Sequence, residues 1–350
     1  MTTRRVLLLA PTLLIVFLLQ SFFWVPTYEQ QTRGNPERLT QYVAASIGDA
    51  SLLNPILSSD SASSNIESLV FEGLIDRDEE LRFRGRLAKS WTISEDAFFF
   101  VNSSRAIPGL GLVDAHRLAD WLAQAQKSTS DPVIRSALSH IVAIDVLPPY
   151  DTQALKQIPD PADKNKKIDI QLRISAPQRI RLQLDHVDQT IFETLAKLLG
   201  PNYFDTFRPE QYVTCDYPVN PDTLSAWATE LIPATEHNPI ILFDLRPNVR
   251  FHDGHEFDAF DVKFTYDAIM DPKNLSPRIA DYEPVKSVEV VQPLQVKVTY
   301  KRLYSPAIGT WSMGILPEHL LNKKALAAEA KRQGRDAQTF CQRDSQFNRH

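Results

Sequence analysis

Residues 240–272 constrain the fold more than any other part of this chain, because they predict strands, a turn and a capped helix in close succession. Residues 240–245 form an apolar run with the length of a buried strand. Residues 249–251 predict a second, short strand. The sequence His252-Asp253-Gly254 then supplies a turn whose glycine can adopt a positive φ. The segment therefore predicts a strand that leads through a tight turn into a helix.

The predicted helix carries a signal at each end. Asp258 stands at the N-cap position, and Asp261, three residues later, is the acidic member of a capping box. Val262 begins an apolar stripe at helical spacing, which predicts the face that packs on the core. Pro272 ends the helix, because proline cannot continue the hydrogen-bond ladder.

Several other segments have the pattern of a regular element. Residues 65–74 predict a helix with Asn65 as its N-cap. Its core face would be formed by Ile66, Leu69, Val70 and Leu74. Strands are predicted at residues 39–47, from residue 87 onward, at 285–291 and at 294–300, with the last two forming a hairpin.

Residues 101–239 resemble a degenerate copy of the segment that follows them. Asp114-Ala115 matches Asp258-Ala259, and residues 141–146 match residues 285–290 at the same spacing. Residues 179–184 would correspond to 295–300 after an additional charged loop. The shared spacing favours an internal duplication, and coincidence stays the alternative.

The N-terminus predicts a membrane anchor. Residues 6–25 are almost entirely apolar, and about 20 such residues match the thickness of a bilayer core. Arg4 and Arg5 precede this run, which places the N-terminus in the cytoplasm and the rest of the chain on the periplasmic or extracytoplasmic face. The run ends without a small-residue cleavage site and without a lipoprotein cysteine. An uncleaved anchor is therefore favoured over a cleaved signal.

Composition excludes several classes of protein. The net charge is −5, and no basic cluster indicates nucleic-acid binding. The two cysteines, Cys215 and Cys341, rule out a CxxC zinc site. In an exported protein they would form one disulfide or remain two separate thiols.

The stretch from Phe243 to Tyr266 closely resembles the signature of the family 5 extracellular solute-binding proteins, the dipeptide- and oligopeptide-binding family. That signature runs F-x-L-R-x-x-V-x-F-H-D-G and, after a short spacer, D-V-x-F-[ST]. Asn54-Pro55, residues 70–74, residues 87–96 and residues 315–321 resemble further blocks of the family in the same order. The positions that we assign to the structural motif are Phe251, His252, Asp253, Gly254, Asp258, Asp261 and Val262.

The resemblance implies an α/β fold of the periplasmic-binding-protein-like type (type II, peptide-binding class), with a mixed sheet and flanking helices, here preceded by one transmembrane helix. It divides the chain into a membrane anchor or uncleaved signal (1–27), the first part of a solute-binding lobe (28–100), an insertion (101–239) and the remainder of that lobe (240–350). The family's second lobe would be missing from this chain.

The resemblance also implies where a ligand would bind. Family members enclose their ligand with backbone groups and aromatic side chains, which on this lobe indicates a turn near residues 49–54 and the stretch 310–313. The predicted contacts are Asp49, Ser51, Asn54, Trp311, Ser312 and Met313. Alternatively, Trp311 and Met313 pack the core.

Neither a metal site nor an active site is expected. His252 and His255 lie in a tight turn and lack the glutamate of an H-E-x-x-H site, so we assign them no metal. The chain has no nucleotide-binding glycine loop and no catalytic constellation, which predicts a protein without enzymatic activity or cofactor.

The function implied by the resemblance is that of the extracytoplasmic solute-binding component of an ABC importer. Such a protein closes its lobes around an oligopeptide or similar solute without making or breaking a bond. Its expected partners are the solute, the permease subunits and, through the N-terminal helix, the membrane. The alternative is a membrane-anchored sensor or assembly module that kept the fold and lost transport.

Overall fold

The computed structural model describes residues 11–21, 48–160 and 166–349. The chain divides into two compact units, residues 1–49 and residues 50–350, which are described separately. In the first unit, residues 11–21 are helical. Among the described residues, no helix is both long and apolar enough to cross a bilayer. The other residues of the predicted anchor 6–25, and the whole of the predicted strand 39–47, lie outside the described part of the chain.

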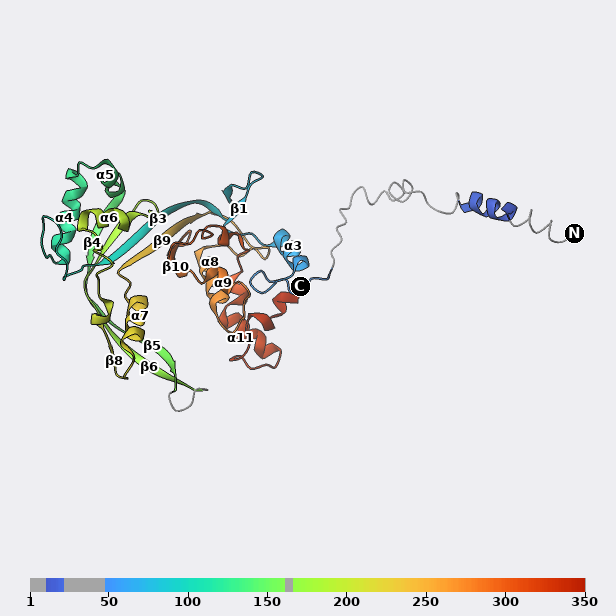
Figure 1. Ribbon diagram of the computed structural model, residues 1–350. Coiled ribbons are helices and arrows are strands. Elements are labelled where there is room, and N and C mark those ends of the chain that lie inside the picture. Colours follow the sequence, from blue (N-terminus) through green and yellow to red (C-terminus); the bar gives the residue numbers. More distant parts are fainter. Residues whose placement is uncertain (1–10, 22–47, 161–165, 350) are drawn as a thin grey trace. The chain divides into compact units, whose positions relative to one another are not determined.

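The second unit is organised around a six-stranded sheet with the order β10-β11-β9-β3-β7-β4 (Figure 1). Its strands are β3 (Ala88–Phe100), β4 (Ile141–Leu147), β7 (Arg179–Leu184), β9 (Thr235–Leu245), β10 (Val285–Gln292) and β11 (Gln295–Tyr300). The α/β prediction is confirmed in its general form, a sheet flanked by helices. The pairing differs from the predicted mixed sheet, because each neighbouring pair in this sheet is antiparallel.

The two long central strands explain this pairing. β3 pairs with β9 from Ala88 and Leu245 at one end to Phe99 and Thr235 at the other. The chain therefore leaves along β3 and returns along β9, so the residues between the two strands form an excursion from one end of the sheet. Whether residues 101–239 are an insertion stays a prediction.

The sheet has two similar halves. β11 and β10 extend it beyond β9, and β7 and β4 extend it beyond β3 in the same manner. Each half has a helix that precedes its edge strand: α8 (Ala259–Met270) before β10 and α4 (Ala115–Ser128) before β4. Both helices begin at an aspartate N-cap, Asp258 and Asp114. The two halves therefore place the segments that were predicted to correspond, such as residues 141–146 and 285–290, at equivalent positions in the sheet. A common origin by duplication stays a prediction.

Three hydrophobic clusters stabilise the second unit. The first lies under α8 and its half of the sheet, with Phe243 and Trp311 fully buried. The second packs α4, α5 (Pro132–Ser139) and α6 (Ile191–Leu199) on the other half. The third lies between α7 (Pro221–Leu231) and a small three-stranded sheet. That sheet has the order β5-β6-β8 and is formed by β5 (Tyr150–Pro159), β6 (Lys167–Ala176) and β8 (Val213–Cys215).

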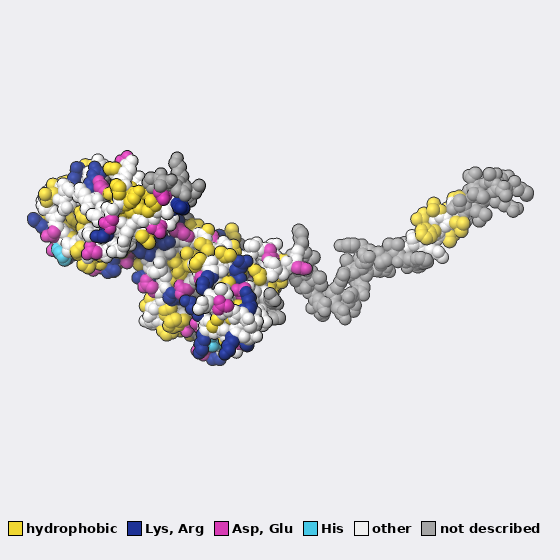
Figure 2. Space-filling view, turned by 90° about the horizontal axis from the view of Figure 1, so that it is seen from below, with side chains coloured by type: hydrophobic (Ala, Val, Ile, Leu, Met, Phe, Trp, Pro, Cys, Tyr) yellow, Lys and Arg dark blue, Asp and Glu magenta, His cyan; other side chains and the backbone are white. Residues whose placement is uncertain are grey.

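Short elements surround these layers. They are α3 (Ser61–Val70), β1 (Ile75–Arg77), β2 (Phe83–Gly85), η2 (Pro209–Tyr212), α9 (Ile279–Tyr282), η3 (Gly309–Ser312), α10 (Glu318–Leu321), α11 (Lys323–Arg332), η4 (Gln342–Asp344) and η5 (Gln346–Arg349). On the face shown in Figure 2, basic and acidic side chains are interspersed.

The helix α8 confirms the local sequence signals. The Asp258 carboxylate accepts a hydrogen bond from the Phe260 N–H at 2.8 Å, and Asp261 accepts from the Asp258 N–H at 3.0 Å, which completes the capping box. The helix ends at Met270, two residues before Pro272. Gly254 has φ +89°, as the predicted turn requires.

The helix α3 differs from its prediction. It begins after Asp60, whose carboxylate accepts from the Ser63 N–H, and ends at Val70 instead of Leu74. Its predicted core face is wrong as well, because Leu69 is 86% exposed whereas Glu67 is buried. Likewise, residues 249–251 form no strand: Arg250 makes only an isolated bridge to Glu256. In both places, long-range contacts override the local pattern.

The two cysteines do not form a disulfide; both are free. Cys215 packs on the cluster beneath the three-stranded sheet, and its sulfur lies 3.2 Å from the Tyr217 carbonyl oxygen. Cys341 follows Phe340, a member of the first cluster, and its sulfur lies 3.4 Å from Asp344 Oδ2. The two thiols belong to different parts of the core, which corrects the possible bridge.

Candidate functional site

The candidate site is built on a seam between two segments that are far apart in the sequence. The Leu74 N–H donates to the Trp311 carbonyl oxygen at 2.8 Å, and the Ile315 N–H donates to the Glu72 carbonyl oxygen at 3.0 Å. We call these two segments, residues 71–74 and 311–315, the seam. Because the first segment leaves α3 to make these bonds, the seam also explains why that helix ends at Val70.

Two glycines allow the segments of the seam to approach each other. A Cβ atom on Gly73 would lie 2.4 Å from the Ser312 carbonyl oxygen, and one on Gly314 would lie 2.5 Å from the Phe71 Cβ. Both distances are shorter than nonbonded contacts allow, so a side chain at either position would force the seam apart. Glycine is needed here for close backbone approach.

Two of the cavities that adjoin the seam lie next to each other along it. The smaller has a volume of about 320 Å³ and the larger about 940 Å³. They share four lining residues, Asp76, Arg278, Ser312 and Met313. The smaller cavity is also lined by Glu67 and Gly314, and the larger by Phe83 and Tyr304. A continuous surface of mixed charge and aromatic character therefore follows the seam.

Two polar groups at the smaller cavity lack a partner. Glu67 is 6% exposed; its Oε2 accepts a hydrogen bond from the Ser58 hydroxyl at 2.7 Å, whereas its buried Oε1 has no hydrogen-bond partner. The Nε of Arg278 is also buried without a partner. Burial raises the pKa of Glu67, partly offset by the Ser58 bond and the Arg278 charge. Buried polar atoms are normally paired, so one carboxylate oxygen and one guanidinium nitrogen without a partner, on two residues that line the same cavity, indicate a place for a polar ligand.

The position of Arg278 is fixed by the backbone around it. Arg278 immediately precedes α9, and its N–H donates to the Ser276 hydroxyl oxygen at 3.1 Å. The Ser276 hydroxyl in turn donates to the Ile56 carbonyl oxygen at 2.6 Å in the buried core. A well-anchored turn thus carries Arg278, which lines both cavities.

Charged and aromatic side chains line the outer part of the site. Asp76 accepts from Arg84 at 2.9 Å, and this hydrogen bond is the main reason that the pKa of Asp76 is lowered. The guanidinium of Arg77 lies over the ring of Phe83, 4.7 Å from its centre. Tyr282, at the base of the larger cavity, donates its hydroxyl to the Thr310 carbonyl oxygen at 2.7 Å, and burial raises its pKa.

The predicted contacts at residues 311–313 separate into two kinds. Ser312 and Met313 line both cavities. Trp311 is 1% exposed, its indole N–H donates to the Tyr300 hydroxyl at 3.0 Å, and its ring makes an edge contact with Tyr282. The alternative of core packing therefore describes Trp311, whereas Ser312 and Met313 stay candidates for ligand contact.

The predicted ligand contacts at residues 49–54 lie away from the two cavities beside the seam. Asn54 is fully buried, and its side-chain amide donates to the Asn348 Oδ1 at 2.9 Å. Ser51 is exposed and donates to Asp60 at 2.6 Å. Asp49 is exposed in the first unit. None of the three lines the two cavities beside the seam.

Sequence reasoning missed Glu67, Arg278 and Gly73. Glu67 is the one charged residue of α3, and a single charge in an otherwise uncharged helix was the signal that could have indicated a functional residue. Arg278 lies in no local pattern, because only the long-range contact of α3, α9 and η3 brings it to the cavity.

The turn of the family signature, residues 252–255, is called the signature turn, and it packs against His319. His255 stacks on His319 at 3.8 Å between ring centres, and His319 Nε2 lies 2.6 Å from Asp253 Oδ2. The hydrogen bond from His319 is the main cause that lowers the pKa of Asp253. These contacts connect the turn to α10.

Comparison with known proteins places part of the chain in a family. Residues 226–337 match the family model described as bacterial extracellular solute-binding proteins, family 5 Middle. This part of the chain is similar to family 5. The matched segment includes Arg278 and the second segment of the seam, and the resemblance seen in the sequence is confirmed there. Glu67 and Gly73 lie outside it.

Two curated proteins are similar to short stretches of this chain. The glutathione-binding protein GsiB of Salmonella paratyphi A is 41% identical over 64 residues, 18% of this chain and 12% of that protein. The oligopeptide-binding protein AppA of Bacillus subtilis is 37% identical over 87 residues, 24% of this chain and 16% of that protein. The chain therefore covers only a small share of the length of these relatives.

Two solved structures are similar to a larger share of this chain. NikZ from Campylobacter jejuni, in complex with Ni(L-His), has 19% sequence identity and a TM-score of 0.35, and the match covers 80% of this chain and 28% of that one. AppA from Bacillus subtilis, in complex with a nonapeptide, has 16% identity and a TM-score of 0.35, with 79% and 27% covered.

Proposed function

We propose that this chain supplies one wall of an extracytoplasmic solute-binding site, and that the solute is an oligopeptide or a similar zwitterionic molecule. The observation that carries the proposal is the pair of unpartnered groups at the smaller cavity, Glu67 Oε1 and Arg278 Nε. The amine of such a ligand can donate a hydrogen bond to Glu67 Oε1, and its carboxylate can accept one from Arg278 Nε.

The chemistry of the site suits a peptide in two respects. A guanidinium presents its donors in a planar fork that matches a carboxylate, and Arg278 lines both cavities. The aromatic rings of Phe83 and Tyr304 in the larger cavity offer apolar surface for side chains next to the charged terminus. Two relatives that match short stretches of this chain are named for binding glutathione and oligopeptides, which supports this solute class.

The role in the cell follows from the family. We propose that the site closes around its solute by a hinge movement and passes it to the permease subunits of an ABC importer. Location on the extracytoplasmic side, with residues 6–25 as the attachment to the membrane, belongs to the same proposal. No chemical step is required of the site, because recognition by hydrogen bonds and packing is sufficient.

The test is a peptide titration of the full chain and of Arg278→Gln, followed by two-dimensional NMR. Both cavities are open on one side, so we expect weak binding, with a Kd of about 1 mM or higher. Glutathione and short peptides should shift the amide signals of Gly73 and Gly314. Arg278→Gln should weaken binding at least tenfold, which corresponds to about 1.4 kcal/mol.

Arg173→Gln is the matched control, because Arg173 is an exposed arginine of β6 whose partner is Asp216 at 2.9 Å. It should bind peptide as the unaltered chain does. The proposal fails if Arg278→Gln, folded by circular dichroism, binds equally well, or if the shifted signals lie away from the seam.

A further inference from the structure

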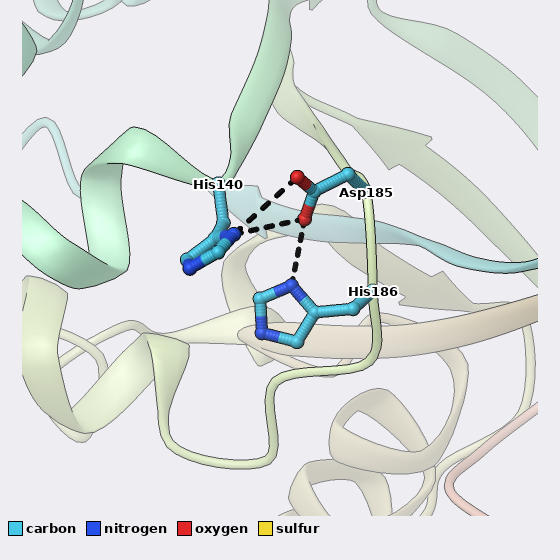
Figure 3. Close-up of side chains that lie close together, drawn as sticks. All are labelled: His140, Asp185 and His186. Atoms are coloured by element: carbon cyan, nitrogen blue, oxygen red, sulfur yellow. Dashed lines mark hydrogen bonds and ion pairs between the residues drawn. The ribbon is translucent and has the colours of Figure 1, made fainter.

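Two imidazoles and one carboxylate converge at the end of the sheet that carries α4 and α5 (Figure 3). The Nδ1 of His140 lies 3.0 Å from Asp185 Oδ1, and the Nδ1 of His186 lies 2.7 Å from the same oxygen. The two imidazole rings meet nearly edge to face, with their centres 4.2 Å apart. The hydrogen bond from His186 is the main cause that lowers the pKa of Asp185, which favours its charged form.

The backbone holds these residues together. His140 immediately precedes β4, and Asp185 immediately follows β7. These strands are antiparallel neighbours, with Ile141 paired to Leu184, so the residues just outside the pair meet at the same end. The Asp185 N–H donates to the His140 carbonyl oxygen at 3.1 Å, which extends the ladder by one bond.

The other half of the sheet has the same backbone arrangement with different side chains. There, the Lys301 N–H donates to the Pro284 carbonyl oxygen at 2.8 Å. The side chains of Lys301 and Arg302 each lie 3.2 Å from a carboxylate oxygen of Glu283. Each half of the sheet therefore has, at the corresponding place, one carboxylate between two basic side chains. Only imidazoles, however, have a nitrogen lone pair to give to a metal ion at neutral pH.

We propose that His140, Asp185 and His186 form a binding site for a divalent transition metal ion of the Zn²⁺ type. Imidazole nitrogen and carboxylate oxygen are ligands that Zn²⁺ accepts, and three protein ligands leave a fourth position for water or another small ligand. The ion replaces the protons that the imidazoles now share with the carboxylate.

The spacing of the ligand atoms supports this assignment. One atom from each of the three residues can be chosen so that all lie within 4.8 Å of one another. Ligand atoms around a tetrahedral Zn²⁺ with bonds of about 2.0–2.1 Å are about 3.3 Å apart. The two contacts to Asp185 Oδ1, at 3.0 and 2.7 Å, therefore need to lengthen by about 0.3 and about 0.6 Å. The partial exposure of all three side chains leaves access for the ion.

The signature turn provides an internal comparison. His255 and His319 also lie near a carboxylate, that of Asp253, but their rings are stacked at 10°. Within the described part of the chain, His140, Asp185 and His186 are the group whose atoms meet the metal-ligand spacing. His255 is therefore a matched control for a histidine that lies beside another imidazole without forming this site.

The test is a Zn²⁺ titration of the full, metal-stripped chain in competition with a chromophoric chelator, followed by the visible spectrum of bound Co²⁺. We expect one ion per chain and a Co²⁺ spectrum typical of nitrogen and oxygen ligands. His186→Ala and Asp185→Asn should each weaken binding at least about tenfold, since even residues that only support a ligand usually contribute that much. His255→Ala should leave the affinity unchanged.

Thermal unfolding without metal shows whether each variant is folded, and Asp185→Asn serves as the milder change because it keeps the side-chain volume. The proposal is overturned if the unaltered chain binds no Zn²⁺ at equimolar concentration. It is also overturned if His186→Ala and Asp185→Asn bind as the unaltered chain does, or if His255→Ala is the variant that loses the ion. Each of these three results would leave Asp185 as a structural carboxylate, like Glu283.

Discussion

Replacing Gly73 by alanine tests the seam directly, because the added methyl group would meet backbone and not a movable side chain. The new Cβ would lie 2.4 Å from the carbonyl oxygen, 2.5 Å from the carbonyl carbon and 2.8 Å from the Cα of Ser312. No rotamer can relieve this contact, since Cβ is fixed by the backbone. The two segments of the seam must therefore separate.

The expected cost follows from what the separation removes. Overpacking of a well-packed contact costs about 1–3 kcal/mol. The two hydrogen bonds of the seam, from the Leu74 and Ile315 N–H groups, contribute about 1 kcal/mol each if they are lost. We expect Gly73→Ala to lower the free energy of unfolding by about 3 kcal/mol and the Tm by roughly 5–10 °C.

Urea unfolding of the full chain, monitored by circular dichroism and by tryptophan fluorescence, measures the loss. Gly48→Ala is the control, because no atom lies within 4 Å of its added Cβ and its φ is not positive. It should change stability by less than about 0.5 kcal/mol. A Gly73→Ala protein as stable as the Gly48→Ala control would refute the close contact of the seam.

Two further predictions concern the start of α8. Asp258→Ala removes the N-cap acceptor of the Phe260 N–H and should lower the unfolding free energy by about 1 kcal/mol while leaving peptide binding unchanged; a loss of binding at unchanged stability would contradict it. Burial raises the pKa of Asp261 above its ordinary 3.8, so the folded state keeps a proton that the unfolded state has released. The contribution of Asp261 to stability should therefore fall as the pH rises from about 4 through the raised pKa and then level off. Other carboxylates, Glu67 among them, also titrate in this range, so the test is the difference between the unaltered chain and Asp261→Asn in unfolding curves measured from about pH 3 to pH 7. This difference should shrink as the pH rises, and a difference that does not change with pH would contradict the assignment to Asp261.

The sequence predicted correctly those elements whose interacting residues are close together in the chain. The capping box of α8 involves residues three apart, and it was predicted from Asp258 and Asp261. The hairpin of β10 and β11 was predicted for the same reason, because its strands are adjacent in the sequence. In contrast, α3 was placed too late and its buried face misassigned, since its apolar residues border a cavity of about 480 Å³ instead of the core.

The candidate site could be predicted only in part. Ser312 and Met313 were found through the family resemblance, and both line the cavities. Glu67 and Arg278 lie 211 positions apart in the sequence, and no local pattern connects them. Their significance depends on burial without a partner, which exists only in the folded chain. The same holds for the His140 cluster, which is assembled by the pairing of β4 with β7.

Photo-cross-linking tests the central claim, that a peptide contacts the surface along the seam, more directly than any affinity. A tripeptide that carries a photoreactive phenylalanine is irradiated with the full chain, and the modified residues are identified by mass spectrometry. We expect cross-links within residues 71–86 and 304–314, with Met313 prominent, that unlabelled peptide competes away and that Arg278→Gln reduces. Cross-links concentrated on the three-stranded sheet or around α4 and α5, or cross-links that unlabelled peptide does not suppress, would contradict the account.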